Sequence, residues 1–236
     1  MVYGKYEGFC FDAVKDDRIF ENFKTNLIYN EILEHVPKNE GLTYYSNIPD
    51  ANNFIGLFPN DSIGNPNKTQ YGKYFLSPTT LRYIKILCDI KKRFRTIDNL
   101  NICEIGIGYG GQFLALDTIF SIKHYVFIDL PGACALTEKY LSKFTTKCPY
   151  SFKSKIEESE YDLVISNFAF TEFPKQLQEE YLIKIVSKAK RGFLILNMEQ
   201  GFTYKELLER IPGSTIIWDG LNWGHVIHKV WTWNNV

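Results

Sequence analysis

Residues 101–112 read NICEIGIGYGGQ, a short apolar run that breaks into four closely spaced glycines. The apolar run is typical of a buried strand, and the segment Gln112–Phe120 that follows it is typical of a helix. The backbone between them must turn sharply, and glycine allows this because it has no Cβ and adopts positive φ freely. A strand, a glycine-rich turn and a helix in this order predict the corner of a doubly wound α/β sheet where nucleotide cofactors bind.

Two acidic residues accompany the glycine turn. Glu104 lies inside the strand, just before Gly106, and Asp129 ends a second apolar run, His124–Asp129. The spacing to Asp129 is close to the roughly 20 residues expected of an acid that binds a ribose, which both NAD and S-adenosylmethionine (SAM) contain. The pattern Gly106-x-Gly108-x-x-Gly111 also satisfies the dinucleotide fingerprint. Glu104 inside the strand and the long segment before the motif favour SAM.

The composition excludes several classes of protein. The 236 residues, 45% of them hydrophobic, can bury one substantial core. The 27 basic residues balance the 27 acidic ones, which gives no bias toward nucleic acid or an anionic membrane. The five cysteines lack CxxC spacing, which argues against a zinc site and for a reducing compartment, and we expect Cys103 to be a buried thiol. No signal sequence or membrane-length apolar run is present, so we predict a cytoplasmic protein.

The chain is predicted to have two regions. In residues 1–76, amphipathic helices are expected over Asp16–Val36, followed by loop over Pro37–Lys73, which is rich in Asn, Gly, Pro and Tyr. We interpret residues 1–76 as a helical and loop extension, a lid on the acceptor side, with a poorly ordered surface loop as the alternative. Residues 77–236 are interpreted as the SAM-binding domain, beginning at the Ser77-Pro78 helix start.

From Asn101 onward, predicted strands and helices alternate, which indicates parallel strands with crossover helices. The predicted strands are Ile102–Ile107, Tyr125–Asp129, Tyr150–Lys153, Asp162–Ser166, Gly192–Asn197, and a closing antiparallel pair, Ser214–Trp218 and Val226–Trp233. The predicted helices are Gly111–Phe120, Ala133–Phe144, Lys175–Ala189 and Thr203–Arg210. The predicted fold class is therefore α/β: a Rossmann-like class I SAM-dependent methyltransferase with a seven-stranded, mostly parallel sheet and an antiparallel C-terminal hairpin.

Candidate catalytic groups follow the fourth predicted strand, because ligands of open α/β sheets bind beyond the carboxyl ends of the strands. That strand runs into Phe168-Ala-Phe-Thr-Glu172 and places Ser166, Asn167 and Glu172 near the expected methyl-transfer position. Glu172 is a candidate base for a hydroxyl, or it only stabilises the first turn of the next helix; both interpretations stay open. Residues 167–170 lack the prolines of the Asn-Pro-Pro-aromatic turn, which weakens an N-methylation interpretation.

The terminal hairpin and the end of the fifth predicted strand add two further candidate bases. His225 and His228 are three apart in a predicted strand, so they face opposite sides and are unsuited to share a metal. We rank Glu172 first as base, then His225, then Glu199. The sequence has no dedicated carboxylate cluster for Mg²⁺, and we expect no metal.

Five blocks of sequence together resemble one family, the sugar O-methyltransferases, class I SAM-dependent enzymes of bacterial surface-polysaccharide gene clusters. The matching blocks are DSIGNP (61–66), SPTTLRY (77–83), ICEIGIGYGGQ (102–112), FIDLPGACALTEKYL (127–141) and YDLVISNFAFTEF (161–173). The resemblance covers about residues 60 to 190, and the last three blocks are more specific than a generic glycine motif.

The resemblance implies methyl transfer from SAM to a sugar hydroxyl in a capsule or other surface-polysaccharide precursor. It implies a small-molecule partner, a nucleotide-linked sugar or capsule intermediate, and no nucleic acid; a homodimer is compatible with it. It implies that Glu104, Gly106, Gly108 and Asp129 bind SAM and that Gln112, Asn167 and Glu172 lie near the reacting groups. To these cofactor contacts we add, as predictions, Tyr109, Gly110, Gln112, Leu130 and Ser166. The alternatives are a phosphate or phosphoramidate oxygen as acceptor, an NAD-dependent oxidoreductase, and a non-catalytic subunit with this fold.

Overall fold

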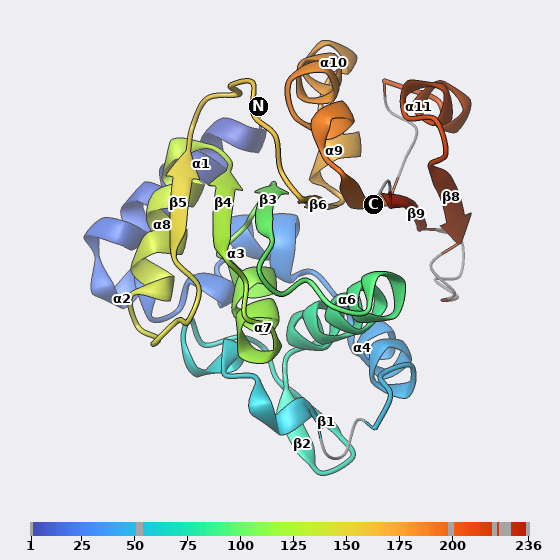
Figure 1. Ribbon diagram of the computed structural model, residues 1–236. Coiled ribbons are helices and arrows are strands. Elements are labelled where there is room, and N and C mark those ends of the chain that lie inside the picture. The colour runs from blue at the N-terminus through green and yellow to red at the C-terminus, as the bar shows by residue number, and fades with distance from the viewer. Residues whose placement is uncertain (1, 51–53, 198–200, 219–220, 222–227, 235–236) are drawn as a thin grey trace. The chain divides into compact units, whose positions relative to one another are not determined.

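The computed structural model describes residues 2–50, 54–197, 201–218, 221 and 228–234, and Figure 1 shows their course. The chain divides into two compact units. The first comprises Met1–Thr96, Gly108–Phe120 and Leu130–Lys147, and the second comprises Ile97–Ile107, Ser121–Asp129 and Cys148–Val236. The chain passes from the second unit to the first inside the glycine turn.

The second unit is built on a seven-stranded sheet in the order β5-β4-β3-β6-β7-β9-β8. Its strands are β3 (Asn101–Ile105), β4 (His124–Ile128), β5 (Tyr150–Lys153), β6 (Leu163–Asn167), β7 (Arg191–Leu196), β8 (Thr215–Trp218) and β9 (Lys229–Asn234). Strands β3 to β7 pair in parallel, and β9 pairs antiparallel with both β7 and β8. Figure 1 shows β5, β4 and β3 side by side. The predicted seven-stranded, mostly parallel sheet with an antiparallel hairpin is confirmed.

The sequence accounts for this sheet through its apolar runs. Parallel strands are covered on both faces and therefore need continuous apolar residues rather than an alternating pattern. In β3, Ile102, Cys103 and Ile105 have no exposed surface, which confirms the predicted burial of the Cys103 thiol. In β9, Trp231 and Trp233 are equally buried. The central strands are therefore held mainly by the burial of large apolar side chains.

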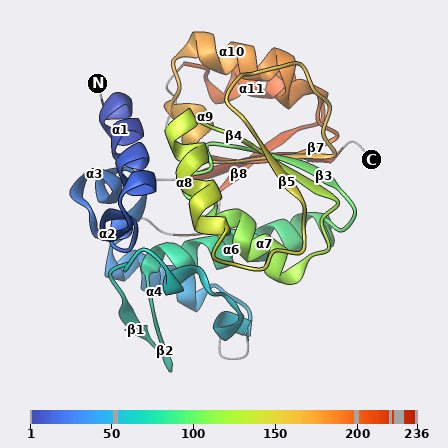
Figure 2. The same cartoon turned by 90° about the vertical axis from the view of Figure 1, so that its left-hand side faces the viewer.

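Three helices of the second unit follow its later strands: α9 (Ala169–Glu172), α10 (Lys175–Lys184) and α11 (Tyr204–Arg210). Helices α10 and α11 lie side by side in both views (Figures 1 and 2). Two ion pairs join them, Lys175 with Glu206 at 3.0 Å and Arg210 with Glu179 at 2.6 Å. The helix predicted over Lys175–Ala189 is shorter in the structure. The α-helix α10 ends at Lys184, and a 3₁₀ turn, Val186–Lys188, completes the segment.

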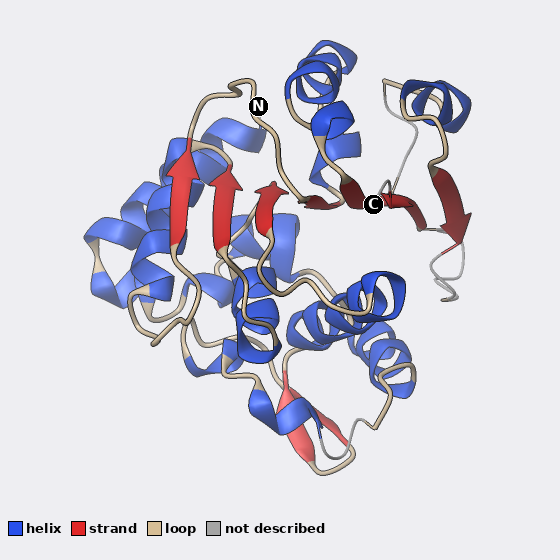
Figure 3. Cartoon of the chain, in the orientation of Figure 1, coloured by secondary structure: helices blue, strands red, loops and turns tan. Residues whose placement is uncertain are grey.

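The first unit is mainly helical, with one small hairpin, as the colouring of Figure 3 shows. Its α-helices are α1 (Val2–Lys15), α2 (Asp17–Phe20), α3 (Leu27–Tyr29), α4 (Lys38–Ser46), α6 (Pro78–Phe94), α7 (Gly111–Ile119) and α8 (Pro131–Leu141). Short 3₁₀ and π turns lie at Phe23–Thr25, Asn30–Glu34, Ile55–Leu57 and Asn60–Ser62, and the hairpin pairs β1 (Thr69–Tyr71) with β2 (Tyr74–Leu76). Among the described residues, no helix has both the length and the apolarity needed to cross a bilayer.

Two predictions about the first unit had different outcomes. The start of α6 is as predicted: the Ser77 side chain accepts a hydrogen bond from the Thr80 N–H, and Pro78 occupies the first turn. The loop predicted from Pro37 is wrong for Lys38–Ser46, which forms α4. Burial of Tyr44 and close packing of Gly41 against the Tyr71 side chain outweigh the weak helix propensity of this segment.

The pairing of β7 with β9 leads to a stability prediction. Gly192 lies opposite Trp233, and a Cβ at this glycine would lie 2.1 Å from the indole ring. We expect Gly192→Val to lower the free energy of unfolding by about 1–3 kcal/mol or more, because a well-packed core tolerates added volume poorly. The control is Gly8→Ala in α1, where a Cβ has no neighbour within 4 Å and stability should rise by about 0.5–1 kcal/mol. Urea unfolding of both variants measures the difference, and equal midpoints would contradict the packing argument.

Candidate functional site

The carboxyl ends of several parallel strands meet at one edge of the sheet in the second unit. β3 pairs in parallel with β4 and with β6, and β6 pairs in parallel with β7, so their last residues lie at the same edge. The chain leaves this edge through Gly106, Asp129, Phe168 and Asn197. Backbone turns and polar side chains are therefore concentrated where open α/β sheets bind their ligands.

Gly106 begins the glycine turn with a left-handed backbone. Its φ is +78°, and its N–H donates to the Ile128 carbonyl at 3.0 Å. A Cβ at Gly106 would lie 2.1 Å from the Cβ of Ala169 at the start of α9. Glycine is therefore required here by backbone conformation and by packing against α9.

Asp129 fixes the next residue of the turn. Its Oδ2 accepts a hydrogen bond from the Ile107 N–H at 2.8 Å, and the carboxylate is half-buried at the end of β4. A charged acceptor makes this bond stronger than one between neutral groups. The predicted Asp129 and Gly106 are thus brought together, with the carboxylate tied to the backbone of the turn.

Glu104 lies deeper in the sheet than the sequence suggests. It is 1% exposed, and its Oε2 accepts a hydrogen bond from the Tyr125 hydroxyl at 3.0 Å. Burial raises the pKa of Glu104 to about 8; the Tyr125 hydrogen bond opposes this shift, and the negative charge of Asp129 adds to it. The Glu104 carboxyl therefore holds its proton at neutral pH.

Ser166 and Phe168 shape the segment after β6. The Ser166 hydroxyl donates to the Ile105 carbonyl at 2.9 Å and accepts from the Phe170 N–H at 3.2 Å, which ties β3 to α9. Phe168 has a φ of +74°, a conformation that costs a side-chain-bearing residue on the order of 1–3 kcal/mol. Its ring packs edge-on against His228, with centroids 4.9 Å apart. This strained turn separates Asn167, at the end of β6, from the start of α9.

Glu172 belongs to a small polar network with Asn197, the residue after β7. The Asn197 Nδ2 donates to Glu172 Oε1 at 2.8 Å, and the Thr171 hydroxyl lies 2.7 Å from Asn197 Oδ1. Glu172 is half-buried. An amide that holds one carboxylate oxygen orients the whole carboxylate, which is the arrangement needed by a group that accepts a proton from a fixed direction.

The remaining cofactor residues predicted from the sequence lie in the first unit. Gly108 and Gly110 also have positive φ, +58° and +81°. A Cβ at Gly108 would lie 2.2 Å from Leu33, and one at Gly110 would lie 2.7 Å from the Thr137 methyl. The Thr137 hydroxyl donates to the Gly108 carbonyl at 3.1 Å. The second half of the turn is therefore enclosed by the unit's own side chains.

Tyr109, between these two glycines, points into an aromatic cluster. Its ring is fully buried and contacts four others, with centroids between 4.8 and 6.4 Å away: Phe23, Tyr29, Tyr83 and Tyr140. Gln112 is also buried, and its Nε2 donates to the Tyr83 carbonyl at 3.3 Å. Leu130 is half-buried and precedes the first turn of α8. These side chains anchor the turn within the unit.

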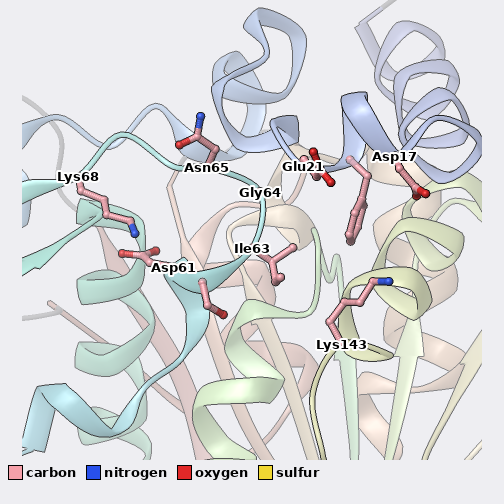
Figure 4. Close-up of a pocket in the computed structure, with 10 residues that line it drawn as sticks. Asp17, Glu21, Asp61, Ile63, Gly64, Asn65, Lys68 and Lys143 are labelled. Atoms are coloured by element: carbon pink, nitrogen blue, oxygen red, sulfur yellow. The ribbon is translucent and has the colours of Figure 1, made fainter.

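Residues 61–65 line a cavity of about 390 Å³ in the first unit. Figure 4 shows Asp61 and Lys68 on one wall and Lys143 on the opposite one. The Asp61 carboxylate also caps α6: Oδ1 accepts from the Ser77 hydroxyl at 2.8 Å and from the Thr80 hydroxyl at 2.7 Å. Two of the blocks that carry the family resemblance are thus joined directly through the first turn of α6.

Solved structures with a similar fold include methyltransferases. Magnesium protoporphyrin IX methyltransferase from Synechocystis PCC 6803, solved with bound SAM, aligns with a TM-score of 0.50 and 10% identity, over 84% of this chain and 98% of that chain. The fold is that of a class I methyltransferase. The bifunctional kinase-methyltransferase WbdD aligns with a TM-score of 0.49 and 17% identity, over 65% of this chain and 38% of that chain. No family model matches the chain, and no curated protein matches it.

The strand order separates this fold from the dinucleotide-binding one. The dinucleotide fold has six parallel strands in the order 3-2-1-4-5-6. Here β9, which follows β8 along the chain, lies antiparallel between β7 and β8. The glycine pattern that NAD and SAM proteins share is therefore set in a sheet of the methyltransferase kind.

Two candidate bases, His225 and Glu199, lie outside the described residues. Within the described part of the chain, no three His, Cys, Asp or Glu side chains gather as metal ligands would.

Sequence reasoning missed the contribution of Asn197 and of Lys24, which contacts the Tyr109 ring. Asn197 is the last residue of the predicted strand Gly192–Asn197, so its position was a usable signal. Lys24 offers no such signal.

The buried Glu104 carboxyl generates a pH prediction. The unfolded chain releases this proton near pH 4.5 and the folded chain near pH 8, so the folded state binds more protons between these values. Stability from this group should therefore fall as pH rises from about 4.5 to 8. Glu104→Gln, which keeps an acceptor for Tyr125 but cannot ionise, should flatten that slope. Urea unfolding at pH 5 and pH 8.5 checks this, and parallel pH profiles for the two proteins would contradict it.

Proposed function

We propose that this chain is a SAM-dependent O-methyltransferase that acts on a sugar hydroxyl in a bacterial capsule or other surface-polysaccharide precursor. The observation that carries the proposal is the arrangement at the carboxyl ends of the parallel strands in the second unit. There Asp129 accepts a hydrogen bond from the glycine turn, and Asn197 donates one to Glu172. The methyltransferase fold supports the reaction class, and the five resembling sequence blocks support the acceptor.

The residues at this edge fit an adenosyl cofactor. Gly106 exposes backbone rather than a side chain, and Asp129 presents a carboxylate beside it. A carboxylate at this position suits the hydroxyls of a ribose. We propose Gly106, Asp129 and the backbone near Ser166 as cofactor contacts in the second unit. Glu104 lies behind them, and Gly108, Tyr109, Gly110, Gln112 and Leu130 remain predicted contacts from the first unit.

When bound, SAM supplies an activated methyl group, so the protein has to align the acceptor, exclude water and take up a proton. A sugar hydroxyl holds its proton tightly near neutral pH, and we assign proton uptake to a carboxylate oxygen of Glu172. Asn197 orients this carboxylate through its Nδ2 donor. Asn167, at the end of β6 and just before the strained Phe168 turn, is proposed to position the acceptor.

Cofactor binding is the first test of the proposal. We expect the protein to bind SAM and not NAD in a calorimetric titration, and Asp129→Asn to weaken SAM binding about tenfold, because a charged hydrogen-bond acceptor is lost. Asp162→Asn is the matched control. Asp162 Oδ2 also accepts a backbone N–H, from Asn101 at 2.9 Å, but it lies at the amino ends of the strands. A protein that prefers NAD, or equal loss in both variants, would contradict the cofactor assignment.

Catalysis is the second test. With labelled SAM and a panel of nucleotide-linked sugars and capsule intermediates, we expect a methylated sugar in the mass spectrum. Glu172→Gln should lower kcat about 10²–10⁴-fold with unchanged SAM affinity, because a general base is lost. Glutamine can still accept the Asn197 hydrogen bond, so the network should persist.

Glu179→Gln is the control for this test, since Glu179 is an ion-paired acid on α10. If Glu172→Gln kept wild-type turnover on a sugar hydroxyl, Glu172 would not be the base. Turnover only on phosphate or phosphoramidate acceptors would replace the sugar hydroxyl with an oxygen that is already anionic and needs no base.

A further inference from the structure

Lys24 is a buried ammonium group in the first unit. Its side chain is 1% exposed, and Nζ donates to the Asn60 carbonyl at 2.6 Å. Nζ also lies 4.1 Å from the centroid of the Tyr109 ring and 5.1 Å from that of Tyr140. None of the ion pairs in the described part of the chain involves Lys24. The groups in direct contact with its charge are therefore a carbonyl and aromatic faces.

Asn60 connects Lys24 to the glycine turn. It has no exposed surface, and its carbonyl accepts from Lys24 and from the Tyr140 hydroxyl, the latter at 2.9 Å. Its side-chain Nδ2 donates to the Gly111 carbonyl at 2.8 Å. Gly111 is the first residue of α7 and the last glycine of the turn. Lys24 thus contacts the turn twice, at the Tyr109 ring directly and at Gly111 through Asn60.

Burying this ammonium is costly, so its retention calls for a reason. Burial lowers the pKa of Lys24 to about 8; the carboxylates of Glu34 and Asp61 oppose that shift, and Lys68 adds to it. The phenols of Tyr109 and Tyr140 face the same group. Replacing a whole buried ion pair by apolar side chains of similar volume is often neutral or stabilising, and Lys24 has no ion-pair partner in the described part of the chain that its replacement would leave behind. A contribution to folding stability therefore does not by itself explain a lysine at this position.

We propose that Lys24 is a positioning residue for cofactor binding, which fixes the second half of the glycine turn by holding Tyr109 and, through Asn60, Gly111. The inference rests on the proposed function, since it concerns the turn assigned to SAM. The N-terminal segment supplies the group that sets the backbone of Gly108–Gly111 before any ligand arrives.

The experiment compares SAM affinity with stability. We expect Lys24→Met to raise the Kd for SAM about tenfold at pH 7, the cost of a lost hydrogen bond from a charged donor, while the urea midpoint stays equal or rises. Lys85→Met is the matched control. Lys85 is similarly buried and ion-paired with Asp89 within α6, so its loss should leave the SAM Kd unchanged. If Lys24 had only a structural role, Lys24→Met would lower the SAM affinity and the urea midpoint together.

The pH profile adds a readout specific to the ammonium. SAM affinity of the wild-type protein should fall more than that of Lys24→Met as pH rises from 7 to 9, because only the wild type loses a charge at residue 24 in that window. Comparing the two profiles removes the titration of SAM itself. Identical profiles would overturn the inference.

Asn60→Asp tests the connection independently, in case Lys24→Met does not fold. An aspartate places an acceptor against the Gly111 carbonyl, which breaks the connection and costs about 1–3 kcal/mol of stability, partly offset by attraction between the new carboxylate and Lys24. SAM binding should therefore weaken in a protein that still folds. Wild-type affinity in Asn60→Asp, or in a folded Lys24→Met, would overturn the inference and leave the proposed function intact. Failure of the wild-type protein to bind SAM would instead overturn the proposed function.

Discussion

The hydrogen bond from the Ile107 N–H to the Asp129 carboxylate is the interaction on which the candidate site at the carboxyl ends of the parallel strands depends. It joins the residue after β3 to the residue after β4, and the parallel register of these strands brings the two within reach. Because the acceptor is charged, the bond fixes the direction in which the chain leaves the sheet. The left-handed Gly106 and its packing on Ala169 follow from that direction.

Much of this edge could be predicted from sequence, because the signals are local. A continuous apolar run, a glycine cluster and an acid at the end of the next run determine β3, the turn and β4 without knowledge of distant contacts. The reason for the glycines was only partly predictable. Sequence reasoning attributes them to the approach of a ligand, whereas the side chains of Ala169 and Leu33 already exclude a Cβ at Gly106 and Gly108.

The features that sequence could not give depend on residues far apart in the chain. The Glu172–Asn197 contact joins residues 25 positions apart, and the Asn60–Gly111 contact joins residues 51 apart. The helix α4 forms from a segment with weak propensity because its burial outweighs that preference. Lys24 looks like any surface lysine in the sequence, and only its position over Tyr109 shows otherwise.

The antiparallel insertion of β9 also has a consequence for how the molecule is made. β8 pairs only with β9 in the described sheet, although β8 comes first along the chain. During synthesis from the ribosome, β7 and β8 emerge before the strand that joins them, so both present unpaired backbone until residues 229–234 appear. The indoles of Trp231 and Trp233 enter the interior only when this strand pairs. A nascent chain that pauses before residue 229 would expose the unpaired backbone N–H and C=O groups of β7. Such groups pair readily with other chains, so aggregation is most favoured before β9 has joined the sheet.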